Sequence, residues 1–325
     1  MSVVITQEQL AKSAAKYRKE LLKLPVLALA PILKYMTLRT GIRDSETVGE
    51  LAGSFEFGPY DRKRRDESDI TISPRTLQVF LGNAVKCFDP NDVVSSIYGS
   101  SITNGDGLKK VDIVTQVVSF LCGKLGEGLA RHIFDAVRDA GKTDTKSLFN
   151  GFDTILLKEI TDGNVSEDKG NLFKFAEAIT ADNAVDMITS FCRAAHDELL
   201  GVEDGADANN GLYLFVPRQI VYNYRDDYKT TTGHSPIYDE FNQMTVEGFP
   251  NIRFVPAAGK AKSKIIQLTS RKNSLVGVNG ADEREKIEIN KYHNFELDFA
   301  ATMFFGTQYE SIAPERILVG ELAAN

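Results

Sequence analysis

The sequence predicts an α+β fold in which helices come first and strands come later. Two observations support this prediction: apolar residues recur at helical spacing between Lys110 and Ala140, and short β-type runs fill the region after residue 250. Before the long helix, alternating apolar and polar residues predict one long hairpin. With 325 residues, the chain can form one large domain or two smaller ones.

The first predicted element is an amphipathic helix that begins near Thr6. Thr6 and Gln9 have capping-box spacing, and an apolar stripe continues to Leu21. Pro25 ends or kinks this helix. Because no second helix follows closely, two interpretations remain open: a helix of the core, or an arm that packs on a neighbouring subunit.

A long hairpin with a charged tip is predicted next. Phe55 and Phe57 alternate with polar residues, and alternation returns from Ile70 to Leu81. The candidate inter-subunit contacts at the tip are Arg62, Lys63, Arg64, Arg65, Asp66 and Glu67. The alternative is a solvated turn without a partner. Nucleic-acid binding is disfavoured, because the acidic residues cancel most of the field of the basic ones.

Further helices and strands follow. The long helix carries an apolar stripe that includes Val114, Val118 and Leu125, and we expect it to pack on the strands of residues 295–319. A second helix is predicted from residue 180 to 199, ended by Gly201. Residues 212–216 are predicted as a strand, and Pro217 suits the first turn of a helix after it.

Composition and charge exclude several classes of protein. The net charge of −7 argues against a dedicated nucleic-acid binder, whose domain is usually basic. Cys87, Cys122 and Cys192 are widely spaced, which predicts free thiols in a reducing compartment. The N-terminus does not have the pattern of a signal peptide. Lysines and prolines interrupt the apolar run of residues 21–36, so we expect no membrane span.

No motif indicates catalysis. His132, His196, His234 and His293 have no HExxH or HxxxH spacing, which favours structural roles. The acidic run of residues 203–207 lacks the spacing of a calcium loop. The sequence contains neither a phosphate-binding loop motif nor a GxSxG nucleophile motif. We therefore predict no catalytic residue, no cofactor and no metal.

The order of these elements resembles the major capsid proteins of tailed bacteriophages, which have the Hong Kong 97-type fold. The likeness extends through Phe149-Asn-Gly-Phe152, Leu212 to Arg225, Gly248-Phe-Pro-Asn-Ile-Arg-Phe254 and Phe295 to Val319. The resemblance implies an N-terminal arm (1–36), an extended β-hairpin or E-loop (37–83), a peripheral domain (84–150 and 286–325) with a long spine helix (110–140), and an axial domain (151–285).

The resemblance implies a structural subunit and no enzyme. Such a subunit self-assembles into hexamers and pentamers of an icosahedral shell that encloses double-stranded DNA. It implies this chain itself as the main partner, allows portal, scaffolding and decoration proteins, and implies non-specific contact with packaged DNA. The expected location is the virion capsid, after assembly in the host bacterial cytoplasm.

Departures from the family pattern and alternative functions also follow from the sequence. No long acidic helical segment precedes the arm and the chain keeps Met1, so we expect no proteolytic maturation, and a separate scaffolding protein or none. Lys63 alone does not support a covalent crosslink. One alternative is an encapsulin-like nanocompartment, whose cargo is protein. Another is a metal-dependent enzyme that uses His234 and His293, and a third, weaker one is a tail-tube protein.

Overall fold

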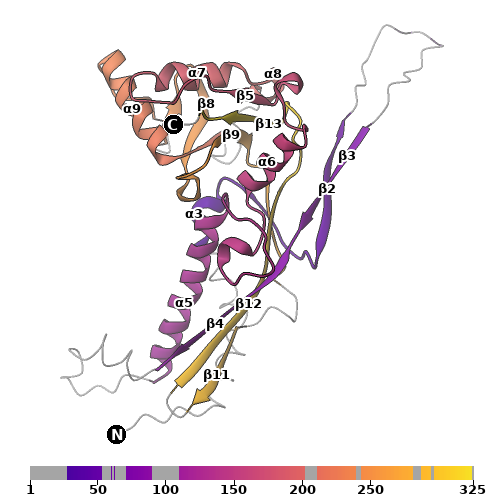
Figure 1. The fold of residues 1–325 in the computed structure, drawn as a ribbon, viewed down its shortest axis with the longest axis vertical. Helices are drawn as coiled ribbons and strands as arrows, with labels where there is room; N and C mark the ends of the chain where they lie inside the picture. Colours follow the sequence, from indigo (N-terminus) through magenta and orange to yellow (C-terminus); the bar gives the residue numbers. More distant parts are fainter. Residues whose placement is uncertain are drawn as a thin grey trace.

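The computed structural model describes residues 28–52, 60, 62, 71–89, 110–201, 211–238, 243–280, 287–293 and 296–323. In this part of the chain, a broad upper sheet lies above a long narrow one, and a two-stranded hairpin projects from between them (Figure 1). Helices and strands both contribute to each larger unit, which confirms the predicted α+β class.

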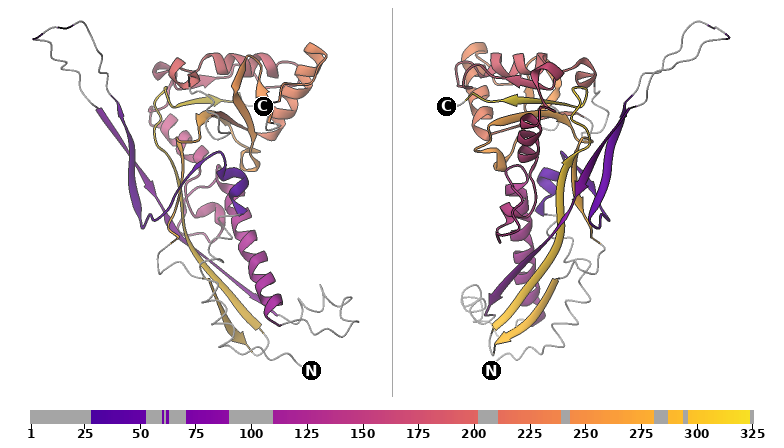
Figure 2. Two further views of the ribbon diagram at one scale, coloured as in Figure 1. Left: turned by 180° about the vertical axis from the view of Figure 1, so that it is seen from behind. Right: turned by 45° about the vertical axis from the view of Figure 1, so that its right-hand side comes forward.

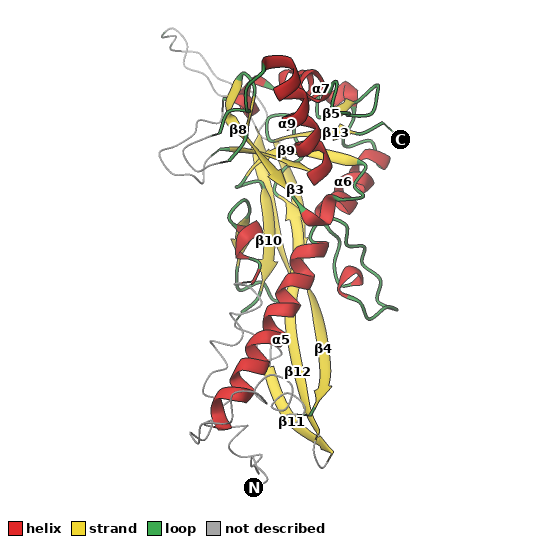
Figure 3. Ribbon diagram, turned by 90° about the vertical axis from the view of Figure 1, so that its left-hand side faces the viewer, coloured by secondary structure: helices red, strands yellow, loops and turns green. Residues whose placement is uncertain are grey.

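The narrow unit is a five-stranded sheet beside one long helix (Figure 3). Its strands are β1 (Thr37–Arg39), β4 (Phe80–Phe88), β10 (Ser274–Val278), β11 (Ile287–His293) and β12 (Glu296–Tyr309). Val118 of helix α5 (Lys110–His132) is buried against Leu297 and Phe299 of β12, and Leu125 packs beside them half-buried. The predicted packing of the long helix on the C-terminal strands is therefore confirmed, although the side chain of Val114 lies outside the described residues.

The broad unit is a six-stranded sheet. Its strands, in order, are β5 (Leu172–Lys174), β13 (Ile317–Glu321), β9 (Ile265–Ser270), β6 (Leu212–Val216), β8 (Phe249–Pro256) and β7 (Thr245–Val246). Helices α7 (Ala184–Arg193) and α9 (Arg218–Thr232) cover one face, where Leu214 joins their core. Tyr213 and Phe215 join the core on the opposite face. Burial on both faces explains why β6 reads as a continuous apolar run.

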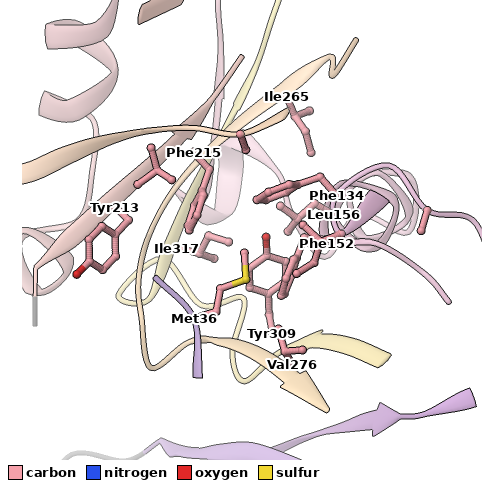
Figure 4. Packing of buried hydrophobic residues seen from close by; sticks show 14 of the residues in the cluster. Met36, Phe134, Phe152, Leu156, Tyr213, Phe215, Ile265, Val276, Tyr309 and Ile317 are labelled. Carbon is pink, nitrogen blue, oxygen red and sulfur yellow. The ribbon is translucent and has the colours of Figure 1, made fainter. Parts of the chain in front are cut away.

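The largest core lies where the two units meet (Figure 4). Helix α6 (Phe152–Thr161) places Phe152 in this core, and the short helix α3 (Ala30–Leu33) packs at its edge. The ring of Phe152 lies 5.0 Å from that of Tyr309 and 5.9 Å from that of Phe134, measured between centroids. The ring of Phe134 in turn lies 5.5 Å from that of Phe215 in β6. Aromatic residues from both units thus pack around α6.

The projecting hairpin consists of β2 (Ser45–Ala52) and β3 (Thr71–Gln78), paired antiparallel along their whole lengths. Figure 2 shows that it extends away from both larger sheets. Its root is packed, because Val48 and Leu77 are buried against Leu275 and Phe304 of the five-stranded sheet. The strand predicted around Phe55 and Phe57 lies outside the described residues.

The long helix ends earlier than its sequence predicts. It was expected to continue to Ala140, but α5 ends at His132. The amide groups of Phe152 and Asp153 donate to the carbonyl oxygens of Ile133 and Phe134, at 3.1 and 3.0 Å. Tertiary partners therefore take the place of the hydrogen bonds that would have continued the helix.

Two further segments that were predicted as single units are divided in the structure. The helix predicted over residues 180–199 is divided into α7 and α8 (Asp197–Leu200), because His196 is extended and its ring nitrogen accepts from the amide of Glu198 as the N-cap of α8. The segment 286–325 is divided between the sheets: β11 and β12 lie in the five-stranded sheet, whereas β13 pairs with β5 and β9 in the six-stranded one.

Candidate functional site

The four histidines lie on separate elements. His132 contacts Asp135 through Nδ1 at 2.9 Å at the end of α5, and His196 caps α8. His234 follows α9, where its backbone amide donates to Thr232, and His293 ends β11. In the described part of the chain, no group of three or more His, Cys, Asp or Glu residues could hold a metal ion.

The predicted contact residues at the hairpin tip are described at one position. Arg62 lies in a turn and is exposed, and nearby Tyr60 is 95% exposed. Lys63, Arg64, Arg65, Asp66 and Glu67 lie outside the described residues. The role of the tip as a contact surface therefore stays a prediction. The described residues show how the hairpin is held at its root.

Arg75 of β3 fastens the hairpin to the body. Its Nη2 lies 2.7 Å from Oε1 of Glu159 in α6 and 3.1 Å from Oε1 of Gln308 in β12, and its Nε donates to the carbonyl oxygen of Tyr309. The amide of the Gln308 side chain donates back to the carbonyl oxygen of Thr76. A planar guanidinium with several donors suits this fixed set of acceptors.

The carboxylate of Glu159 is held in its charged form. Burial alone would raise its pKa, but hydrogen bonds from Asn164 and Arg75 prevail and lower it. The Arg75 and Glu159 side chains are only 13% and 16% exposed, so solvent screens their contact less than it screens a surface ion pair.

The hairpin root also presses closely on β12. A Cβ added at Gly306 would collide with the backbone of Gln78, the last residue of β3. Gly306 is paired with Gly277 of β10, so neighbouring strands also limit any adjustment. Only glycine permits this approach between hairpin and sheet.

A second ion pair is fully buried at the junction of the two sheets. Lys260, in the short turn η3 (Ala258–Lys260), places Nζ 2.6 Å from Oδ1 of Asp153 in the first turn of α6. The hydroxyl of Ser263 donates to the other carboxylate oxygen at 2.6 Å. Burial raises the pKa of Asp153 and lowers that of Lys260, whereas the short contact between the two groups favours both charges.

The narrow unit exposes apolar side chains. On β4, Leu81 is 43% and Val85 is 63% exposed, and on α5 Phe120 is 61% exposed. Among the described strands, β4 pairs only with β12, so its other edge is open there. An open strand edge with exposed apolar residues is suited to contact with another chain. The sequence does not mark Val85 or Phe120, and it marks Leu81 only as part of a predicted strand.

Comparison with known proteins gives matches in structure. No protein-family model matches the chain, and no curated protein sequence matches it. A chain of the satellite phage P4 procapsid, which includes the size determination (Sid) protein, is similar over 91% of this chain and 98% of its own, with a TM-score of 0.54 and 10% identity. The capsid of the native GTA particle is similar over 91% of each chain, with a TM-score of 0.51 and 11% identity.

The holo-SrpI encapsulin complex from Synechococcus elongatus is similar over 89% of this chain and 86% of its own, with a TM-score of 0.49 and 9% identity. At such identities, a likeness shows the fold alone. The chain has the Hong Kong 97-type capsid fold, which confirms the expectation from the order of its elements.

Proposed function

We propose that this chain is a major capsid protein, a structural subunit that self-assembles into hexamers and pentamers of an icosahedral shell around double-stranded DNA. The observation that carries the proposal is the likeness to capsid chains over 91% of this chain, because it includes nearly the whole molecule. The projecting hairpin supports it, since a hairpin that leaves its own core is available to contact a neighbour (Figure 2).

The division into parts belongs to this proposal. Residues 1–36 serve as an arm, residues 37–83 as the E-loop, residues 84–150 with 286–325 as the peripheral domain, and residues 151–285 as the axial domain. Because β13 pairs with β9, we add that strand to the axial sheet, and because β10 pairs with β12, we assign β10 to the peripheral sheet. The charged tip from Arg62 to Glu67 is the proposed contact with the neighbouring subunit.

The remaining roles follow from a shell subunit. The chain acts in the virion capsid after assembly in the host bacterial cytoplasm, with its own copies as main partners. The other proposed partners are portal, scaffolding and decoration proteins, and packaged DNA that the chain contacts non-specifically. We infer no catalytic role. In the described residues, no helix has the length and apolarity needed to cross a membrane.

Electron microscopy of the purified protein tests this proposal. Closed shells are expected, and nucleic acid should be the cargo of particles from infected cells. A compact monomer at every concentration would refute the shell function, and protein cargo without nucleic acid would favour the encapsulin-like alternative. Arg62→Glu, combined with reversal of the next three basic residues, should leave the subunit folded but reduce closed shells. The matched control reverses four exposed lysines of the body to Glu: Lys169, Lys229, Lys262 and Lys272.

A further inference from the structure

Helix α6 is fastened at its beginning to the six-stranded sheet. Asp153 in its first turn contacts Lys260 and Ser263, at 2.6 Å each. Both residues lie on the short segment that leads into β9, an inner strand of that sheet. Lys260 is completely buried, and its Nζ also lies 4.9 Å from the centroid of the Phe134 ring. A shift of this segment relative to α6 would therefore separate two charges in an apolar site.

The same end of α6 is also tied to the chain that follows α5. The amide of Gly151 and the hydroxyl of Thr154 both donate to the carbonyl oxygen of Ala136, at 2.8 and 2.6 Å. A Cβ added at Gly259 in η3 would meet the carbonyl oxygen of Arg131 at 2.5 Å, so η3 and the end of α5 are also in close contact. The first turn of α6 is thus in contact with the segment that leads into β9 and with the chain that follows α5.

The other end of α6 is fastened to the hairpin. Glu159 in its last turns contacts Arg75 of β3 at 2.7 Å, and its second carboxylate oxygen accepts from Asn164 at 2.8 Å. Arg75 is also bonded to the carbonyl oxygen of Tyr309, whose ring packs on Phe152 at the opposite end of α6. The two charged contacts are six residues apart, roughly 9 Å along a helix.

Between its two charged contacts, helix α6 is held as a rigid element by its apolar packing. Phe152 and Leu156 are fully buried in the junction core, which prevents α6 from bending away. A helix turn held by apolar packing moves as one body, because packed interiors do not deform continuously. Movement of the hairpin root must then either break the Arg75–Glu159 contact or move the first turn of α6.

We propose that α6 couples the angle of the β2–β3 hairpin to the position of the six-stranded sheet. A change of hairpin angle is transmitted through Arg75 and Glu159 to the helix, and through Asp153 and Lys260 to η3 and β9. This inference extends the proposed shell function: a neighbour that displaces the hairpin would shift the sheet of the same subunit, so subunits in different shell environments would adjust both parts together.

Hydrogen exchange on the isolated, unassembled subunit tests the coupling in both directions. Glu159→Gln removes the charge at the hairpin end, and Lys260→Met removes the charge at the sheet end. Each variant should raise exchange at the remote end as well as its own: Glu159→Gln in β9, and Lys260→Met in β2 and β3. Coupling between sites of the usual size changes such equilibria by about 5- to 150-fold.

Lys174→Met is the matched control, because it breaks the exposed Lys174–Glu167 pair at 3.1 Å on β5 of the same sheet. It should leave hairpin exchange unchanged. If Lys260→Met does not fold, Ser263→Ala removes one hydrogen bond of the same site with less disruption. Exchange that rises only at the mutated end in every variant overturns the coupling.

Electron microscopy of the unaltered protein and of the same variants distinguishes failure of the coupling from failure of the proposed shell function. Shells from the unaltered protein without remote exchange effects would refute the coupling and leave the shell function intact. Remote effects in a protein that never forms shells would support the coupling and refute the function.

Discussion

Lys260→Met should show the cost of leaving Asp153 without its partner. Met retains an aliphatic chain of similar length, so packing near Phe134 is largely kept while the charge is lost. Lys260 is 0% exposed and the Asp153 side chain 7%, so water cannot replace the missing partner. Removal of one member of a buried pair costs about 3–5 kcal/mol. With 325 residues, a typical unfolding entropy of about 2.1 cal/mol/K per residue converts this cost into a Tm decrease of roughly 4–7 °C.

The double variant Lys260→Met/Asp153→Leu distinguishes a lost partner from lost packing. With both charges removed, unfolding free energy should return to within about 1–2 kcal/mol of the original protein, because apolar replacement of a buried pair is often neutral. The hydroxyl of Ser263 has the carbonyl oxygen of Ile265 as another acceptor at 2.8 Å, so it is not left unpaired. Denaturant unfolding of the unassembled subunit measures Lys260→Met, Asp153→Leu and the double variant. A double variant as unstable as the sum of the two single ones would refute this reasoning.

Three further outcomes are expected. Leu129→Ala should reduce the unfolding free energy by about 2–5 kcal/mol, because the Leu129 side chain is only 6% exposed. Leu125→Ala should reduce it by less, because Leu125 is half-buried. Equal costs in denaturant unfolding would contradict the described packing of α5. Cys87 is exposed and should react with a thiol reagent in the folded protein. Burial raises the pKa of Cys192 to about 12, so this thiol should react only after unfolding. Labelling is followed by mass spectrometry, and rapid labelling of both cysteines would count against the fold. The pKa of Glu159 is lowered below its ordinary value of 4.5, so its contribution to the unfolding free energy should be complete above pH 4.5 and be lost as the pH falls further. Glu159→Gln should therefore flatten the dependence of stability on acid pH. An unchanged profile would show that another carboxyl group is responsible.

The elements with strong periodicity were predictable from the sequence. The stripe of α5 recurs at helical spacing over several turns, and its contact with β12 follows because both surfaces are apolar. The end of α5 was not predictable, since the groups that replace its last hydrogen bonds belong to Phe152 and Asp153. Local sequence contains no signal of such distant partners.

The contacts of α6 were hidden for the same reason. Arg75 and Glu159 are 84 positions apart, and Asp153 and Lys260 are 107 positions apart. With 45 acidic and 38 basic residues in the chain, no particular pair stands out before the fold brings it together. Arg62 and its neighbours at the hairpin tip were conspicuous because they are consecutive, whereas a charged pair across the fold has no such pattern.

The junction of the two sheets combines an apolar core with charged contacts, and the two have different consequences. Apolar packing around Phe152 and Leu156 stabilises α6 and keeps it rigid, but this packing includes no described residue of the β2–β3 hairpin. The contacts of Asp153 and Glu159 require specific distances and partners, and each becomes unfavourable when its partner moves away. A more apolar junction could be equally stable, yet it would lack the Arg75–Glu159 contact that links the hairpin to α6. We therefore attribute the link between the hairpin and the six-stranded sheet to these two charged contacts, the position of the hairpin root to its packing on the five-stranded sheet, and the stability of the junction to the core that surrounds α6.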